Sequence, residues 1–129
     1  MAEAIASAIG LQAYDIKTPL TEDVDMLFLC TAVYAAGVDD AVKYFLRNPG
    51  VKIGNIVNIS TAALFPSTYK QVERLALEQS IRMDEREFHC RGEFLGLHRG
   101  RPDEHDLKAA QEFARAVVGK AYLVRAGLT

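Results

Sequence analysis

The chain has 129 residues, of which 50% are hydrophobic and 25% are charged, a composition typical of a globular protein and unlike that of a disordered one. This length is common for a single domain, so we expect one domain spanning residues 1–129 with one core. A formal net charge of -2 leaves no basic field able to neutralise several phosphates, which argues against nucleic-acid binding.

The first sixteen residues predict a helix followed by a strand. Residues 2–9 place Ile5 and Ile9 four positions apart among alanines, and Gly10 then supplies a stop signal. Residues 11–16 alternate between apolar and polar side chains before a Thr-Pro turn, a pattern typical of a short strand.

Two covered strands with a helix between them are expected next. Residues 25–33 form a continuous apolar run after an acidic turn, which indicates a parallel strand covered on both faces, and we expect it to be central. Residues 38–47 carry apolar side chains at the spacing of one helix face and end at an Asn-Pro-Gly turn. Residues 53–59 predict a second covered strand.

The rest of the chain predicts a helix, an exposed strand and a long final helix. Ser67 and Thr68 are suited to cap the first of these helices, whose apolar side is formed by Val72, Leu75 and Ala76. Residues 81–88 mix apolar and charged side chains as an edge strand does, and residues 91–100 predict a loop. Asp103 and Asp106 mark the start of the last helix, which continues through Leu107, Ala110, Phe113, Ala114 and Val117.

Helices that alternate with short buried strands predict an α/β fold. We expect a three-layer sandwich in which an open parallel sheet, joined by right-handed crossovers, carries helices on both faces.

Metal, membrane and secretory signals are weak in this sequence. Cys30 and Cys90 lie far apart without a C-x-x-C or Cys/His ligand spacing, so we expect two small buried thiols and neither a zinc site nor a redox pair. No apolar stretch approaches the roughly 20 residues of a membrane span. The segment after Met1 has neither a basic region nor a long apolar region of a signal peptide, so we expect a cytoplasmic protein.

Two loops that follow predicted strands are the candidate ligand site, because ligands of open α/β sheets bind at the carboxyl ends of the strands. The first loop has small residues and an aromatic ring suited to stacking, and its candidate residues are Thr31, Ala32, Val33, Tyr34, Ala35 and Gly37. The second offers two hydroxyls and an apolar wall, from Ser60, Thr61, Ala62, Ala63 and Phe65. Together the two loops are suited to clamp a planar heterocycle.

Each candidate has a structural alternative. The first loop is equally well explained as an ordinary connection with Tyr34 packed on the surface. Ser60 and Thr61 are of the residue types that commonly cap helices and turns. The sequence has no G-x-S-x-G, G-x-x-x-x-G-K-[ST] or H-E-x-x-H motif, so no serine hydrolase, nucleotide triphosphatase or zinc protease is indicated.

Histidines and arginines provide weaker candidates. His89, His98 and His105 could transfer protons, but no spacing fixes an acidic partner, and solvated histidines are the favoured explanation. Three arginines around one predicted loop could bind a carboxylate or phosphate, although solvated charge is favoured for Arg91, Arg99 and Arg101.

The order of the elements, the segment Phe88-His89-Cys90-Arg91-Gly92 and the later Gly100-Arg101-Pro102-Asp103-Glu104-His105-Asp106-Leu107 resemble the flavodoxins and flavodoxin-like proteins over nearly the whole chain. The resemblance implies non-covalent binding of FMN and transfer of single electrons to a redox protein partner. It also implies that the two loops flank the isoalloxazine ring and that Tyr34 is the stacking residue.

The sequence departs from that family at its start. Flavodoxins begin with a strand and a phosphate-binding loop, whereas residues 1–5 resemble the helix that follows that loop. The resemblance therefore implies a fold that lacks the first strand and binds FMN weakly or with the help of a partner. The missing strand would expose a sheet edge, so we expect either that residues 11–16 pair directly with residues 25–33 or that a second chain covers the edge in a homodimer.

Three functions are weighed on these grounds. The leading hypothesis is a flavodoxin-like electron-transfer protein, and the second is a cofactor-free interaction or structural module built on the same fold. A hydrolase or transferase that uses a histidine ranks last, because no triad supports it.

Overall fold

A computed structural model describes residues 1–33, 38–62, 67–91 and 102–125 of the chain. The chain divides into two compact units. We call Tyr14–Arg101 the sheet unit, and Met1–Ala13 together with Pro102–Thr129 the helical unit. Each is described by itself.

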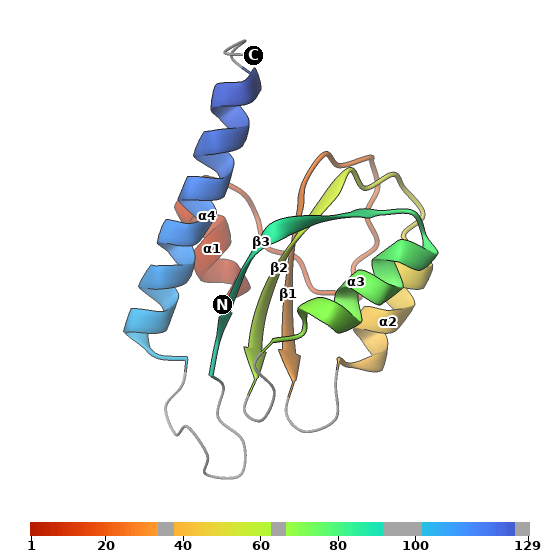
Figure 1. Ribbon diagram of the computed structural model, residues 1–129, viewed down its shortest axis with the longest axis horizontal. Helices are drawn as coiled ribbons and strands as arrows, with labels where there is room; N and C mark the ends of the chain where they lie inside the picture. Colours follow the sequence, from red (N-terminus) through yellow and green to blue (C-terminus); the bar gives the residue numbers. More distant parts are fainter. Residues whose placement is uncertain (34–37, 63–66, 92–101, 126–129) are drawn as a thin grey trace. The chain divides into compact units, whose positions relative to one another are not determined.

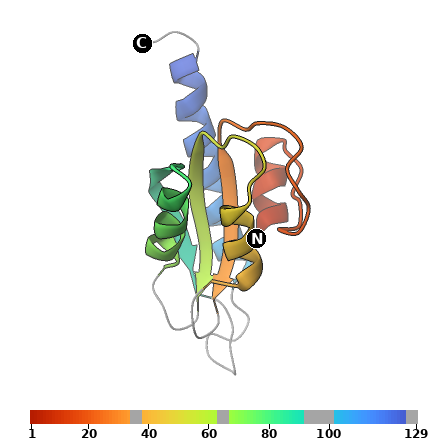
Figure 2. The ribbon, with the colours of Figure 1, turned by 90° about the vertical axis from the view of Figure 1, so that its right-hand side faces the viewer.

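The sheet unit is built on three parallel strands in the order β1-β2-β3, formed by Leu27–Val33, Asn55–Ala62 and Arg82–Cys90. Helix α2 (Asp40–Arg47) connects the first two strands, and α3 (Tyr69–Glu78) connects the last two (Figures 1 and 2). The predicted α/β fold with an open parallel sheet is therefore confirmed.

Helices α2 and α3 pack against each other over one face of the sheet, with which their apolar sides form the core. Leu29 and Ile56 point to this face, opposite Leu46 and Val72 from the two helices. Leu46, Ile56 and Val72 are completely buried, as the predicted helical spacing requires. Among the described residues of the sheet unit, α2 and α3 are the helices, and both lie on this face, so the three-layer arrangement with helices on both faces stays a prediction.

The prediction that residues 25–33 form the central strand is wrong. β1 pairs with β2 alone among the described residues, so β2 is the central strand and β1 lies at an edge. Burial follows this order: nearly every side chain of β2 is buried, whereas in β1 buried Leu29 and Thr31 alternate with partly buried Phe28 and Cys30. β3 is half exposed at the other edge, as predicted.

The predicted strand at residues 11–16 is also wrong. These residues form no strand, and the side chain of Leu11 is 62% exposed despite the alternating pattern. The predicted direct pairing of residues 11–16 with β1 is therefore not formed, and the one ladder partner of β1 among the described residues is β2.

The helical unit contains α1 (Ala2–Ile9) and α4 (Glu104–Arg125), which pack against each other. Gly10 ends α1 in the left-handed conformation with a φ of 71°, as its position predicted. At the start of α4, Asp103 and Asp106 each accept a hydrogen bond from the other's backbone N–H, at 3.0 and 2.8 Å. These two bonds form a reciprocal cap at the predicted start of the helix. Among the described residues, no helix is long and apolar enough to cross a membrane.

Candidate functional site

The carboxyl ends of β1 and β2 lie side by side. Their parallel register runs unbroken to the last residue of each strand, with Val33 opposite Ala62. The last described residues before the two loops of the predicted ligand site are therefore neighbours at one edge of the sheet (Figure 1). We call this edge, with the starts of α2 and α3, the carboxyl edge.

A row of polar side chains crosses the sheet just below this edge. Thr31 is opposite Ser60, and Ser60 is opposite His89 on the third strand. Two residues earlier, Asn58 is opposite Glu87. Because side chains two apart on a strand share a face, these five lie on the face that α3 covers. Polar groups thus replace the apolar core near the carboxyl edge.

Thr68, the residue that precedes α3, joins this row to the helix. Its hydroxyl lies 2.8 Å from the hydroxyl of Thr31 and accepts a hydrogen bond of 2.9 Å from the amide of Asn58. Its backbone N–H donates to the hydroxyl of Ser60 over 3.4 Å. All four side chains are buried, three of them completely. The hydrogen bonds therefore fix the start of α3 to the ends of β1 and β2.

Two buried amide oxygens have no hydrogen-bond partner among the described residues. They are Oδ1 of Asn58, next to Thr68, and Oδ1 of Asn55 at the start of β2. A buried carbonyl oxygen without a donor is costly, and a polar site of this kind commonly holds an ordered water.

The chain's own groups occupy the start of α3. The Ser67 hydroxyl accepts a hydrogen bond of 3.0 Å from the N–H of Tyr69 and donates one of 2.7 Å to the carboxylate of Glu87. Burial, followed by the charge of Glu73 and then that of Glu87, raises the pKa of Tyr69. Burial and nearby carboxylates thus both favour the protonated phenol.

Side chains of the protein also bond to backbone N–H groups at the start of α2. Asp39 accepts a hydrogen bond of 3.1 Å from the N–H of Ala41, and the N–H of Val38 donates to the side chain of Gln71 over 2.9 Å. Since Gln71 belongs to the first turn of α3, this last bond links the starts of the two helices.

An ion pair occupies an irregular segment of β3. Ile56 pairs with Met83 and Asn58 pairs with Glu87, so three residues of β3, from Asp84 to Arg86, lie opposite one residue of β2. Arg86 donates two side-chain hydrogen bonds to the Asp84 carboxylate, at 2.9 and 2.8 Å. The side-chain amide of Asn55 donates a further hydrogen bond to the same carboxylate. The hydrogen bonds from Arg86, with a smaller effect of the one from Asn55, hold the pKa of Asp84 well below its usual range.

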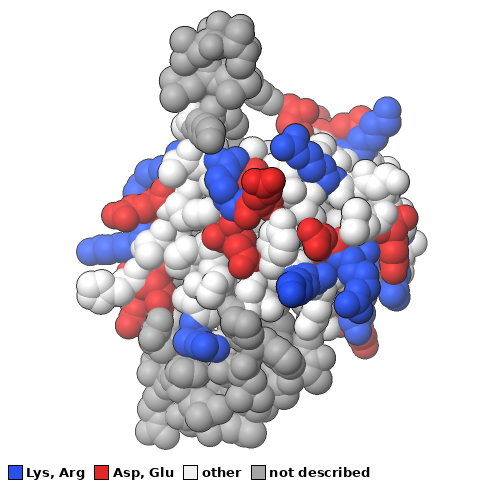
Figure 3. Space-filling model, viewed as in Figure 1, with Lys and Arg blue, Asp and Glu red and all other residues white. Residues whose placement is uncertain are grey.

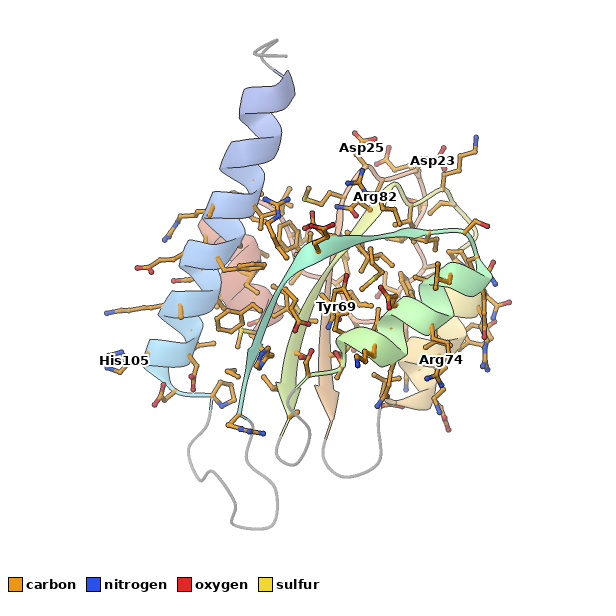
Figure 4. All side chains as sticks on the ribbon, viewed as in Figure 1. Asp23, Asp25, Tyr69, Arg74, Arg82 and His105 are labelled. Carbon is orange, nitrogen blue, oxygen red and sulfur yellow. The ribbon has the colours of Figure 1, made fainter. Side chains whose placement is uncertain are left out.

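Tyr69 closes this ion-paired segment from the helix side. Its hydroxyl donates to the backbone carbonyl of Asp84 over 2.9 Å, and Figure 4 shows its side chain between the start of α3 and β3. The irregular segment is thus bonded to β2 through Asn55 and to α3 through Tyr69. Bulges in strands are common beside functional sites.

The predicted site residues fall into three groups. Thr31 and Ser60 bond internally, so the hydroxyl of Ser60 has the structural use that the sequence left open. Thr61 is partly buried on the opposite face of β2, and Ala62 is buried. Ala32 and Val33 end β1, whereas several predicted residues lie outside the described residues: Tyr34, Ala35, Gly37, Ala63 and Phe65.

The histidines and cysteines show no catalytic arrangement in the part of the chain that the structure describes. His89 and His105 are exposed, as predicted, and Figure 4 shows His105 pointing outward from α4. Burial raises the pKa of Cys30 to about 11, so this thiol is protonated at neutral pH. Both cysteines are partly buried and neither forms a disulfide with a described residue, and the described residues contain no group of three metal-ligating side chains. His98, Arg99 and Arg101 lie outside the described residues.

Sequence reasoning missed Asn58, Glu87 and the Asp84–Arg86 pair. Asn58 had a visible signal, since it is an amide within the apolar run that became β2. Glu87 had none, because its role depends on the register between β2 and β3.

Comparisons with family models, curated proteins and solved structures find no match for this chain.

Proposed function

We propose that this chain is a flavodoxin-like protein of the electron-transfer type, in which a flavin binds at the carboxyl edge between the two loops that follow β1 and β2. The observation that supports this proposal is the pairing of Val33 with Ala62, because it starts both loops at adjacent points. The carboxyl ends of parallel strands are where open α/β sheets bind ligands.

The described residues fit the two parts of FMN unequally. The adjacent loop starts suit a planar ring, which when bound would supply the one-electron chemistry. The phosphate is less well provided for, because some of the N–H groups at the starts of α2 and α3 already bond to Asp39, Ser67 and Gln71. FMN binding is accordingly proposed to be weak or assisted by a partner.

A cofactor-free interaction or structural module is the second candidate. It is favoured by the internal pairing of polar groups at the carboxyl edge, since Thr31 and Ser60 each bond to Thr68. A buried hydrogen-bond network of this kind can stabilise a scaffold without any ligand.

A titration of the purified chain with FMN, followed by quenching of flavin fluorescence, separates these two candidates. We expect saturable quenching, and we expect Tyr34→Ala to weaken it roughly tenfold by removing a stacking contact. Tyr44→Ala is the matched control, because Tyr44 is 70% exposed on α2 and should leave the affinity unchanged. A colourless protein that quenches neither FMN nor riboflavin would favour the scaffold.

The proposal also includes a homodimer, a redox protein as a further partner, and a cytoplasmic location. The outer edge of β1 has no ladder partner among the described residues, and Leu27–Val33 contains no charged residue or proline. Those are the features that normally protect an edge strand from pairing. We expect light scattering at micromolar concentration to give twice the mass of one chain, and the mass of a single chain would exclude the dimer.

A further inference from the structure

The two outer strands of the sheet are protected to different degrees against pairing with another chain. Five of the nine residues of β3 are charged, and the segment from Asp84 to Arg86 makes this strand irregular. Charged side chains and bulges are features that keep an edge strand from recruiting a further strand. Figure 3, in the view of Figure 1 with β3 in front, shows acidic and basic side chains interspersed over this side of the sheet unit.

The edge formed by β1 lacks this protection. The seven residues of Leu27–Val33 include no charged residue or proline and keep a regular register with β2. Among the described residues, β2 alone bonds to the backbone of β1, so the N–H and C=O groups on its outer side have no partner there. Ile16 and Leu20, from the segment before β1, pack against the core without pairing with this strand. The edge is longer than an average strand and is therefore long enough to accept another one.

A second copy of β1 fits this edge in one orientation. Two identical chains related by a two-fold axis contact each other reciprocally. Opposing residues of an antiparallel pair exchange their hydrogen bonds in this reciprocal way, whereas a residue of a parallel pair bonds to the residues on either side of the one opposite it. Two copies of β1 can therefore satisfy each other's outer backbone groups symmetrically when they run antiparallel.

We propose that β1 of a second copy pairs antiparallel with β1, with Cys30 at the two-fold axis, so that the three strands of each copy form one continuous sheet. The inference rests on the homodimer included in the proposed function and adds its orientation and register. Cys30 is the middle residue of Leu27–Val33, so pairing over the whole strand places Cys30 opposite itself and Leu29 opposite Thr31 of the other copy. The two carboxyl edges then lie at opposite ends of the shared sheet, and each copy keeps its own candidate ligand site.

Cross-linking of the thiols with a short bifunctional maleimide tests the register. Opposing side chains of an antiparallel pair lie on the same face with Cβ atoms about 4.5–5.5 Å apart, so two Cys30 thiols would be within reach of one reagent molecule. Cys90→Ser, which retains Cys30, should form a covalent dimer at least roughly tenfold faster than the matched control Cys30→Ser, which retains Cys90. Both reactions are run at alkaline pH, because burial raises the pKa of the Cys30 thiol.

Hydrogen exchange of backbone amides tests the pairing without relying on a thiol. The amides on the outer side of Leu27–Val33 should exchange at least roughly tenfold more slowly in the dimer than after dilution to the monomer, because they then donate to the second copy. The amides of Arg82–Cys90 serve as the internal control and should exchange equally fast at both concentrations. Cys30→Ser should keep the protection of β1, since the bonds come from the backbone.

Each outcome separates the geometry from the dimer itself. A dimer in light scattering that shows neither the Cys30 link nor protection of β1 would overturn the inference while leaving the homodimer intact. Protection of β1 without the Cys30 link would overturn the register. The mass of a single chain would overturn the homodimer together with the inference, whereas the link and the protection together would support both.

Discussion

Gly54→Ala is expected to lower the free energy of unfolding by about 3 kcal/mol, at the upper end of the usual cost of overpacking. A Cβ atom at Gly54 would lie 2.6 Å from the backbone oxygen of Asp25. Two backbone hydrogen bonds of 2.9 Å hold the segments before β1 and β2 this close. The N–H of Val24 donates to the carbonyl of Lys52, and the N–H of Gly54 donates to the carbonyl of Val24. Since the contacted atom is backbone, relief of the clash would require the strands to separate at this point.

Urea unfolding followed by circular dichroism measures this difference. Gly119→Ala is the matched control, because Gly119 is exposed in α4 and a Cβ there would have no contact within 4 Å. Alanine in a helix interior should raise stability by up to about 1 kcal/mol. A Gly54→Ala variant as stable as the wild type would show that β1 and β2 do not approach each other so closely at their starts. Figure 4 labels Asp25 at this amino end of the sheet.

The order and type of the main elements could be predicted because each rests on a local pattern. The helix after Ser67 and the helix after Asp103 have apolar faces at helical spacing with capping residues before them, and both begin where those residues predicted, although α4 continues beyond Val117 to Arg125. The strand at residues 53–59 was shifted, since β2 begins at Asn55 and runs to Ala62. Ser60 and Thr61 were assigned to a loop because polar residues are rare in a buried strand unless their side chains have hydrogen-bond partners, which the sequence does not show.

Strand order could not be predicted in the same way. The apolar runs that became β1 and β2 are alike in composition, and their order depends on which strands are present to pair. Residues 11–16 show this most clearly, because their alternating pattern lacked a partner strand and gave no strand. Local pattern predicts what a segment favours, whereas pairing decides whether its backbone groups are satisfied.

The candidate site was predicted at the level of the edge and missed at the level of side chains. The loops after the strands start side by side, as parallel order requires, but the hydroxyls of Thr31 and Ser60 point into the core beneath α3. Their partner is Thr68, which was noted in the sequence only as a helix cap. Whether a hydroxyl points into the core or toward a ligand depends on which face of the sheet its residue lies on, and a one-residue shift of the strand's register reverses that face.

Asp84→Asn is expected to lower the free energy of unfolding by about 2 kcal/mol at neutral pH. The Asp84 side chain is 9% exposed, and it accepts hydrogen bonds from both Arg86 and Asn55. We place the loss near the middle of the range for charged hydrogen bonds because the Arg86 side chain is 38% exposed and therefore partly screened. Glu78→Gln, which breaks a surface pair with Arg47 at 3.6 Å, should cost less than about 0.5 kcal/mol.

The pH dependence of this loss tests the ion pair directly. Hydrogen bonds from Arg86, above all, lower the pKa of Asp84 in the folded chain, so the unfolded chain binds its proton first as the pH falls. The stability that Asp84 contributes is therefore fully present above its unfolded pKa of about 3.9 and is lost as the pH falls through the lower folded value. The difference in unfolding free energy between the wild type and Asp84→Asn should be constant from pH 7 to about pH 5 and shrink below about pH 4. A difference that grows toward acid pH would contradict the charged pair, since it would require the folded state to take up the proton more readily.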